Sequence, residues 1–483
     1  MEMIPAIIFW ALALFALFWP RPFFIYLFFC AAPFGGFAAV PVEWTLGSTV
    51  LPQAVAAAIL ILRTIIGPQN TPRAWKIATD LKRGGLLTLF VVFAIITGFF
   101  FPRIFTDVLV VPMRGTFRLT EPLMPTTANL TQSLYLLLDL LTLLGLCVFM
   151  SGSQGRQNRQ IVLRGVVAGG IVLAATGVLD FLSPYLGLRP FLSLFRTASY
   201  GFIVDAQILG MRRIVGLYSE AAAFGAATVT WAAMLMFIRP AMPSRLWRNV
   251  VLPVTAFVLL ALAAGSTSST AYLGLFAFCV VAVFNFGQRA IVNRSVVGLR
   301  LEIVLLFLAV VYVGVLIATM PEVVSAFSDI LNTMLFRKAE SSSYVQRNSW
   351  NETAWQAFFG THGLGVGVGG ARTSNWIVSV LSNTGVIGGA LLGGFIVLNL
   401  SRKASTGDKV SAVVLRGAKS AYVVSLLMAT ASATVIDPGL TFSVLMALMM
   451  VSARSGAGQR RSISGGPDGQ LVDAGRPSVS AEA

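Results

Sequence analysis

Long apolar stretches alternate with short polar segments along almost the whole sequence. Most of these stretches approach the roughly 20 consecutive apolar residues that an α-helix needs to cross a bilayer. We therefore predict an all-α polytopic membrane protein with about 12 to 14 transmembrane helices. The expected spans are centred on Ile4–Phe18, Phe23–Ala39, Leu51–Ile66, Leu86–Phe101, Ser133–Met150, Val166–Leu182, Ala221–Ile238, Val250–Ala264, Ala271–Phe286, Leu301–Met320, Trp376–Leu398, Ala418–Ile436 and Leu440–Val451.

The composition excludes a soluble fold. Hydrophobic residues make up 56% and charged residues only 11% of the 483 residues, whereas a soluble domain has about 25% charged residues. The first apolar stretch lacks a basic start and a small-residue cleavage site, so we expect a retained span and not a signal peptide. Residues 1–453 then form one transmembrane domain, and residues 454–483, rich in Gly, Ser and Pro, are expected to be a disordered cytoplasmic tail.

Basic residues fall in every second loop, and this alternation predicts the orientation of the chain. The side that carries them should be cytoplasmic, which places the N-terminus outside and the C-terminus inside. The net charge of +16 is therefore attributed to orientation, and no nucleic-acid partner is expected. The basic loop residues are Arg73, Lys76, Lys82, Arg83, Arg156, Arg159, Arg164, Arg239, Arg245, Arg248, Arg289, Arg294, Arg300, Arg402, Lys403, Lys409 and Arg416.

Three of the outward loops are long, namely Pro102–Gln132, Ser183–Ser219 and Pro321–Asn375. The last loop should contain two short helices, the first of them amphipathic and lying at the membrane surface. The first is indicated by Val324, Phe327, Leu331, Met334 and Leu335 at helical spacing, and the second by Arg347, Trp350, Ala354 and Phe358 on neighbouring turns.

The sequence gives no indication of a metal or redox centre. Cys30, Cys147 and Cys279 lie far apart inside apolar runs, which argues against a disulfide framework or a zinc site. No carboxylate or histidine cluster has metal-ligand spacing, so we predict no metal. Asp139 and Asp180, in or at the ends of spans, are interpreted as hydrogen-bonded packing residues and not as a proton relay.

The outward loops are rich in arginine. A guanidinium group presents a planar fork of donors that matches phosphate oxygens and stays charged, so the set suits a diphosphate-bearing ligand. The alternative is ordinary loop solubility or contact with lipid headgroups. The set comprises Arg103, Arg114, Arg118, Arg189, Arg196, Arg212, Arg213, Arg337, Arg347 and Arg372, with Lys338.

Two ionisable residues are candidates for proton transfer. Glu220 lies at the start of a span shortly after Arg212 and Arg213, and it is either a base or an ion-pair partner of an arginine. His362 is the only histidine and is either a general base or a polar loop residue.

Two segments of small residues are candidate ligand contacts. Gly265–Thr270 either satisfies backbone groups at a helix break or donates hydrogen bonds to a phosphate or sugar through Ser268, Ser269 and Thr270. Gly363–Arg372 matches a dinucleotide fingerprint as a bare string, but its outward position excludes a Rossmann turn. Its small residues, Gly367 and Gly369 among them, either form an anion-binding nest that Arg372 closes or serve as a flexible hinge.

From about Arg212 to Gly394, the order of these segments resembles the O-antigen ligase and Wzy-type polysaccharide polymerase superfamily; earlier residues match only in hydropathy. The segments that carry the resemblance are Arg213–Glu220 with Phe224-Gly225, the Gly265–Thr270 turn, Arg347-Asn-Ser-Trp350 leading into Gly363–Arg372, Ser374-Asn375, and Gly385-Val-Ile-Gly388.

This resemblance implies a GT-C-like membrane glycosyltransferase of the bacterial inner membrane with an external active site that needs no metal, nucleotide or other cofactor. A glycan on undecaprenyl diphosphate is then the donor, and Arg213 and Arg372, with Arg347 next, occupy the positions that hold its diphosphate. The further residues expected at the diphosphate and glycan are Arg212, Ser268, Ser269, Thr270, Gly367, Gly369, Ser374 and Asn375.

Two departures from the superfamily favour a polymerase of an exopolysaccharide or capsule. Ligases carry a histidine where this chain has Ser374, and many members carry an arginine in the serine-rich turn, near the place of Thr270. The alternatives are ligase-type transfer to a lipid or protein acceptor and a lipid-linked oligosaccharide flippase or other transporter. The expected partners are the lipid-linked oligosaccharide, membrane lipid and a chain-length regulator of the same pathway.

Overall fold

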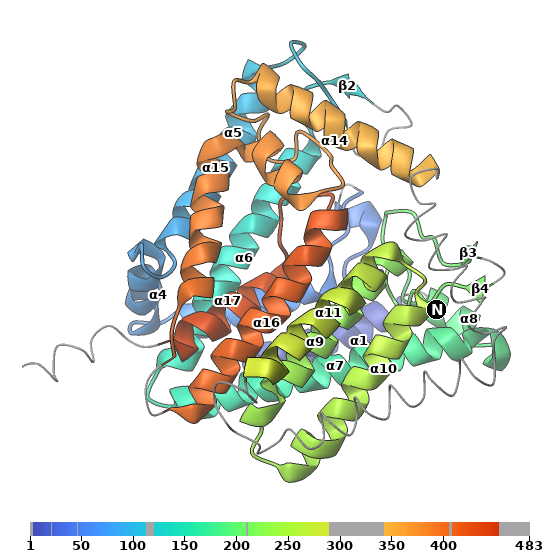
Figure 1. Ribbon diagram of the computed structural model, residues 1–483, viewed down its shortest axis with the longest axis vertical. Helices are drawn as coiled ribbons and strands as arrows, with labels where there is room; N and C mark the ends of the chain where they lie inside the picture. The colour runs from blue at the N-terminus through green and yellow to red at the C-terminus, as the bar shows by residue number, and fades with distance from the viewer. Residues whose placement is uncertain are drawn as a thin grey trace, which may run out of the picture.

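The computed structural model describes residues 3–20, 22–45, 47–112, 120–208, 211–288, 342–404 and 408–453. These residues form a bundle of helices with two short antiparallel strand pairs (Figure 1). The α-helices are α1 (Ile4–Phe18), α2 (Phe23–Cys30), α3 (Pro52–Ile65), α4 (Asn70–Thr79), α5 (Gly85–Ile104), α6 (Thr127–Ser151), α7 (Gly155–Leu186), α8 (Arg189–Ser193), α9 (Ala221–Ile238), α10 (Leu252–Gly265), α11 (Ser269–Gly287), α14 (Ser342–Gly360), α15 (Trp376–Ser401), α16 (Lys409–Ser432) and α17 (Leu440–Ser452). Short turns of other helix types are η1 (Val42–Thr45), η2 (Arg239–Ala241) and η3 (Trp247–Val251), and the strands are β1 (Val110–Val111), β2 (Glu121–Pro122), β3 (Gln207–Ile208) and β4 (Met211–Arg212).

Eight helices in the described part of the chain are long and apolar enough to cross a membrane. They are α5, α6, α7, α9 with η2, η3 with α10, α11, α15 and α16. A ninth is possible by length and composition where α3 and α4 form a pair bent by 108°. The architecture is therefore all-helical, as predicted for a polytopic membrane protein.

Each of these eight helices overlaps one predicted span, and α14 forms where the second loop helix was expected. The predicted span Leu301–Met320, the amphipathic helix near Val324–Leu335 and the tail 454–483 lie outside the described residues. The apolar helices α1 and α17 also lie at predicted spans, but they have only 15 and 13 residues.

The predicted helical span Phe23–Ala39 is wrong, because α2 ends at Cys30. A helix of eight residues is about 12 Å long and cannot cross a bilayer. Close contacts require the backbone beyond α2 to be irregular. The amide of Gly36 donates to the carbonyl of Leu217 at 2.7 Å, and a Cβ on Gly35 would lie 2.8 Å from the ring of Tyr218.

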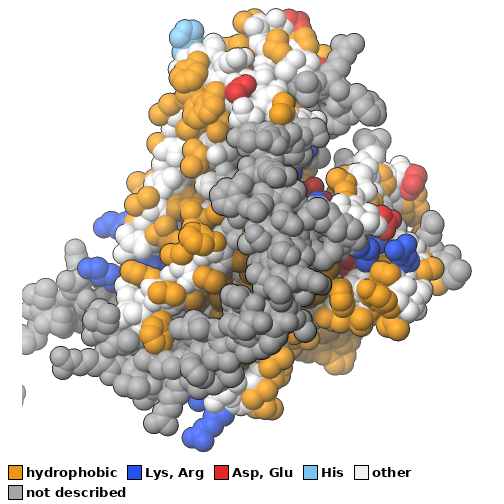
Figure 2. Space-filling model, turned by 45° about the vertical axis from the view of Figure 1, so that its right-hand side comes forward, with side chains coloured by type: hydrophobic (Ala, Val, Ile, Leu, Met, Phe, Trp, Pro, Cys, Tyr) orange, Lys and Arg blue, Asp and Glu red, His pale blue; other side chains and the backbone are white. Residues whose placement is uncertain are grey.

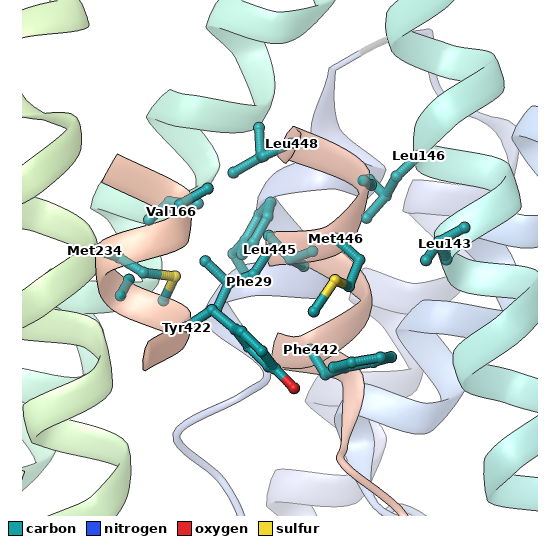
Figure 3. Close-up of a cluster of buried hydrophobic side chains, with 14 of the residues drawn as sticks. Phe29, Leu143, Leu146, Val166, Met234, Tyr422, Phe442, Leu445, Met446 and Leu448 are labelled. Carbon is teal, nitrogen blue, oxygen red and sulfur yellow. The ribbon is translucent and has the colours of Figure 1, made fainter. Parts of the chain in front are cut away.

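The core of the bundle lies around α17. Side chains on all sides of this helix are buried, as expected for a helix that is hydrophobic all round. Figure 3 shows its residues Phe442, Leu445, Met446 and Leu448 among side chains of five other helices. The neighbouring residues labelled there are Phe29 of α2, Leu143 and Leu146 of α6, Val166 of α7, Met234 of α9 and Tyr422 of α16.

The two ends of the bundle differ in chemistry. At one end, which we call the basic end, Lys82, Arg83, Arg156, Arg245 and Lys403 are exposed. Loops far apart in sequence meet there: the guanidinium of Arg402 donates to the carbonyl of Lys82 at 2.7 Å. The other end carries α14 and β2, and we call it the α14 end (Figure 1). Figure 2 shows hydrophobic side chains on the left and lower right of the visible face, with Lys and Arg side chains at its left and lower edges and in a group on the right.

Candidate functional site

Four predicted site residues come together at the α14 end: Arg213, Glu220, Arg347 and Arg372. The charges of Glu220 and Arg347 act on both Arg213 and Arg372. Burial lowers the pKa of the Arg213 and Arg372 guanidinium groups, the Glu220 carboxylate opposes this shift, and the neighbouring positive charge of Arg347 adds to it. All four side chains are partly buried. We call them the arginine site.

Arg213 is held against the serine-rich turn that joins α10 to α11. Its Nε donates to the carbonyl of Ser266 at 3.2 Å, and the amide of Ile214 donates to the carbonyl of Gly265 at 3.2 Å. Ser268 is the N-cap residue of α11, so Ser269 and Thr270 occupy the first helical turn. The free amides and positive dipole end of such a turn favour an anion.

Two further helices begin at the arginine site. Glu220 is the N-cap residue of α9, and Asn375, three positions after Arg372, is the N-cap residue of α15. The side chain of Asn375 accepts hydrogen bonds from the amides of Ile377 and Val378 at 2.9 and 3.3 Å. This residue was predicted to contact substrate, and the structure gives it a capping role.

The backbone around Arg372 is fixed by hydrogen bonds on both sides. The amide of Arg372 donates to the carbonyl of Pro112 at 2.8 Å, and the amide of Ser374 donates to Oδ1 of Asn351 at 2.8 Å. The side-chain amide of Asn383 both donates to and accepts from the backbone of Ala371, each at 3.0 Å. Ser374 itself is buried, with 5% of its surface exposed.

The guanidinium of Arg372 lies over an aromatic ring. Its central carbon is 4.0 Å from the ring centroid of Trp350, and its Nε is buried without a hydrogen-bond partner among the described residues. Trp350 lies on α14 three positions after Arg347, so one helix brings both residues to the site.

The glycine-rich segment forms hydrogen bonds with α15 at the point where that helix is broken. It is therefore not an open anion-binding nest. Gly385 has φ +64° inside α15, which interrupts the helical hydrogen bonds. The amides of Val366 and Gly367 donate to the carbonyls of Ser382 and Asn383 at 2.8 and 2.9 Å, and the amide of Val386 donates back to the carbonyl of Gly363 at 2.9 Å.

Gly367 and Gly369 were predicted ligand contacts, and the structure places both against the backbones of neighbouring helices. Both have positive φ, and a Cβ on Gly367 would lie 2.7 Å from the carbonyl oxygen of Thr97 in α5. A Cβ on Gly369 would lie 2.6 Å from the carbonyl oxygen of Ala128 in α6. Glycine at these two positions therefore allows the segment to pass close to the backbones of α5 and α6.

Arg212 was also a predicted ligand contact, and the structure places it in an ion pair with Asp180. Oδ1 of Asp180, a residue with no exposed surface, lies 2.7 Å from a terminal nitrogen of Arg212 and 2.9 Å from one of Arg196. Oδ2 accepts hydrogen bonds from the amides of Val215 and Gly216 at 2.8 and 3.1 Å. The interpretation of Asp180 as a hydrogen-bonded packing residue is confirmed.

His362 has an exposed side chain and a backbone φ of +53°. It is not among the charges that act on Arg213 or Arg372. Glu220 is the carboxylate whose charge acts on both Arg213 and Arg372. Arg114, Arg118, Arg337 and Lys338 lie outside the described residues.

Sequence reasoning missed the residues that hold the arginines in place. Trp350 was named only in the helix pattern and in the motif Arg347-Asn-Ser-Trp350, while Asn351, Asn383 and Tyr272 were not singled out. Tyr272 lies within electrostatic range of Arg213. The sequence feature that could have identified Trp350 is its position three residues after Arg347 in a predicted loop helix. This spacing places the two large side chains on one face of the helix.

No protein-family model matches the chain, and no curated protein matches it.

The arginine site combines three guanidinium groups with one carboxylate, and the charge of Glu220 acts on Arg213 and Arg372. The positive ends of three helices lie at the site or begin within a few residues of it, an arrangement that could accept an anion. Within the described ranges, no group of three or more His, Cys, Asp or Glu side chains could hold a metal ion.

Proposed function

We propose that the chain is a membrane glycosyltransferase, a polysaccharide polymerase that uses a glycan on undecaprenyl diphosphate as donor. The acceptor is another lipid-linked repeat unit at the external face of a bacterial inner membrane. One observation carries the proposal: Arg213, Arg347 and Arg372 gather with Glu220 at one end of a membrane-type helix bundle. The order of motifs that resembles the superfamily supports the same assignment.

The reaction requires the protein to stabilise the negative charge that develops on the leaving diphosphate. A hydroxyl oxygen of the acceptor forms a bond to the anomeric carbon of the donor sugar as the bond from that carbon to the diphosphate breaks. The electron pair leaves with the diphosphate, where Arg213, Arg347 and Arg372 stabilise the developing charge. Glu220 accepts the proton of the hydroxyl. Fixed arginines in a partly buried site supply this stabilisation without reorganisation.

The position of the site suits a substrate with a lipid tail. A polyprenyl chain stays in the bilayer while its diphosphate reaches the helix ends. Exposed basic residues such as Lys82, Arg83 and Arg245 lie at the opposite end, and the positive-inside rule assigns that end to the cytoplasm. The α14 end then faces outward, where complete lipid-linked repeat units are joined.

Substitution of the arginines tests the proposal. Arg213→Ala and Arg372→Ala should abolish long polymer, and Arg213→Lys and Arg372→Lys should shorten it, because an ammonium group cannot form the bidentate contact. Polymer length is measured by gel electrophoresis of material from cells that carry equal amounts of each variant. Arg245→Ala, at an exposed position of the basic end, is the matched control and should give native lengths.

Native polymer from every well-folded arginine variant would refute the assigned role. The purified protein in vesicles separates the alternatives. Transfer of the glycan to a lipid core or a protein identifies a ligase, and translocation of the lipid-linked glycan without bond formation identifies a flippase.

A further inference from the structure

Arg372 is held differently from the structural arginines of this chain. Arg196 and Arg212 each place a terminal nitrogen within 2.9 Å of the buried carboxylate of Asp180. Within the described ranges, Arg372 has no acidic oxygen in ion-pair contact. The group packed against it is the ring of Trp350, a residue with 9% of its surface exposed.

We propose that Trp350 is a positioning residue, which holds the Arg372 guanidinium by a cation–π contact and leaves its charge and terminal N–H groups available to the diphosphate. This inference rests on the proposed function. A carboxylate partner would neutralise the guanidinium and occupy its donors. An aromatic ring attracts the cation through its negative face, and the N–H groups at the edge of the guanidinium plane stay free.

The hydrogen bonds around Arg372 separate the role of the ring from that of the backbone. Contacts with Pro112, Asn351 and Asn383 fix residues 371–374 without involving the indole. Among the described residues, the indole ring is the group that packs against the Arg372 guanidinium. A change in the electron density of that ring should therefore alter ligand binding while the segment keeps its fold.

The test uses the full chain with site-specific fluorinated tryptophan at position 350. Each added fluorine weakens the negative face of the indole with little change in shape. The probe is undecaprenyl diphosphate in nanodiscs, with undecaprenyl monophosphate alongside it. We expect the dissociation constant for the diphosphate lipid to rise stepwise with the number of fluorines. Trp350→Leu should weaken binding about tenfold, and Trp350→Phe should have an intermediate effect.

Trp355 provides the matched control on the same helix. Its ring stacks on Phe359 with centroids 5.8 Å apart, so fluorination there should leave affinity unchanged. A dissociation constant that stays flat across the position-350 series overturns the inference about Trp350. If Arg372→Ala and Arg213→Ala also bind the diphosphate lipid at native strength, the proposed function fails as well. If those two variants lose binding while the series stays flat, only the inference about Trp350 fails.

Discussion

At the scale of single residues, arginines in this chain take opposite roles according to their partners. Asp180 accepts contacts from Arg196, Arg212 and two backbone amides, which uses both carboxylate oxygens. Arg213 and Arg372 instead rest on a carbonyl and an indole ring, and Glu220 acts on both charges without an ion pair among the described residues. Residue type alone therefore could not separate the structural arginines from the candidate ligands.

Removal of the Asp180 carboxylate should be strongly destabilising. Asp180→Ala leaves two partly buried guanidinium groups and two buried amides without their shared acceptor, a loss expected to cost about 3–5 kcal/mol. The midpoint of thermal unfolding in detergent measures this effect. Asp205→Ala is the control, because that side chain is 71% exposed and lies 3.9 Å from Arg212. Equal midpoints for Asp180→Ala and Asp205→Ala would contradict this account.

At the scale of elements, hydropathy predicted the long helices correctly. It failed where contacts with residues distant in sequence determine the backbone conformation. Eight predicted spans form helices because a bilayer requires every backbone group to be satisfied within the segment. Gly35 and Gly36 lie in an equally apolar stretch, but contacts with Leu217 and Tyr218 keep it irregular. Likewise, the break at Gly385 depends on a segment some twenty positions earlier. A local sequence pattern does not identify such distant contact partners.

The break in α15 should tolerate only glycine. At Gly385, alanine would have to adopt φ +64° and would place its Cβ 2.3 Å from the carbonyl oxygen of Leu364. The backbone conformation alone costs about 1–2 kcal/mol, and the clash adds to it. Gly393→Ala, in the same helix with no atom within 4 Å of the new Cβ, should match or slightly exceed native stability. Thermal unfolding of the two variants checks this, and equal losses would indicate a general helix effect.

The start of α16 is predicted to depend on pH. Hydrogen bonds from Ser411, with a smaller effect of Arg159, lower the pKa of Asp408 to about 2. A depressed pKa in the folded state stabilises the fold above the unfolded value of about 3.9, and this contribution is lost as the pH falls towards 2. Asp408→Ala should therefore cost about 1 kcal/mol near neutral pH.

This difference in stability should be constant from pH 7 to pH 5 and should shrink at pH 3. The difference is measured from the midpoints of thermal unfolding of the native and Asp408→Ala chains at the three pH values. A difference that grows on acidification would contradict the assigned direction of the pKa shift.

At the scale of the whole molecule, the two ends of the bundle are chemically distinct, and each is tied together across the sequence. Arg402 contacts the backbone of Lys82 at the basic end, and Arg159 contacts Ser411 at 2.5 Å. At the α14 end, the segments before α9, within α14 and before α15 bring the arginines together. The order of the motifs predicted that Arg213, Glu220, Arg347 and Arg372 belong together. It could not predict the supporting contacts, since these depend on the packing of α14 against the glycine-rich segment.

This polarity predicts which end faces the cytoplasm, and with it whether the proposed function can hold. In a chain with Cys30, Cys147 and Cys279 replaced by alanine, Leu364→Cys reports on the α14 end and Ser244→Cys on the basic end, both at exposed positions. A membrane-impermeant maleimide should label Leu364→Cys on intact spheroplasts and Ser244→Cys only after permeabilisation, because basic loops stay in the cytoplasm. The reverse pattern would place the arginine site inside the cell. The donor would then have to be consumed before it crosses the membrane, and a polymerase of translocated repeat units would be excluded.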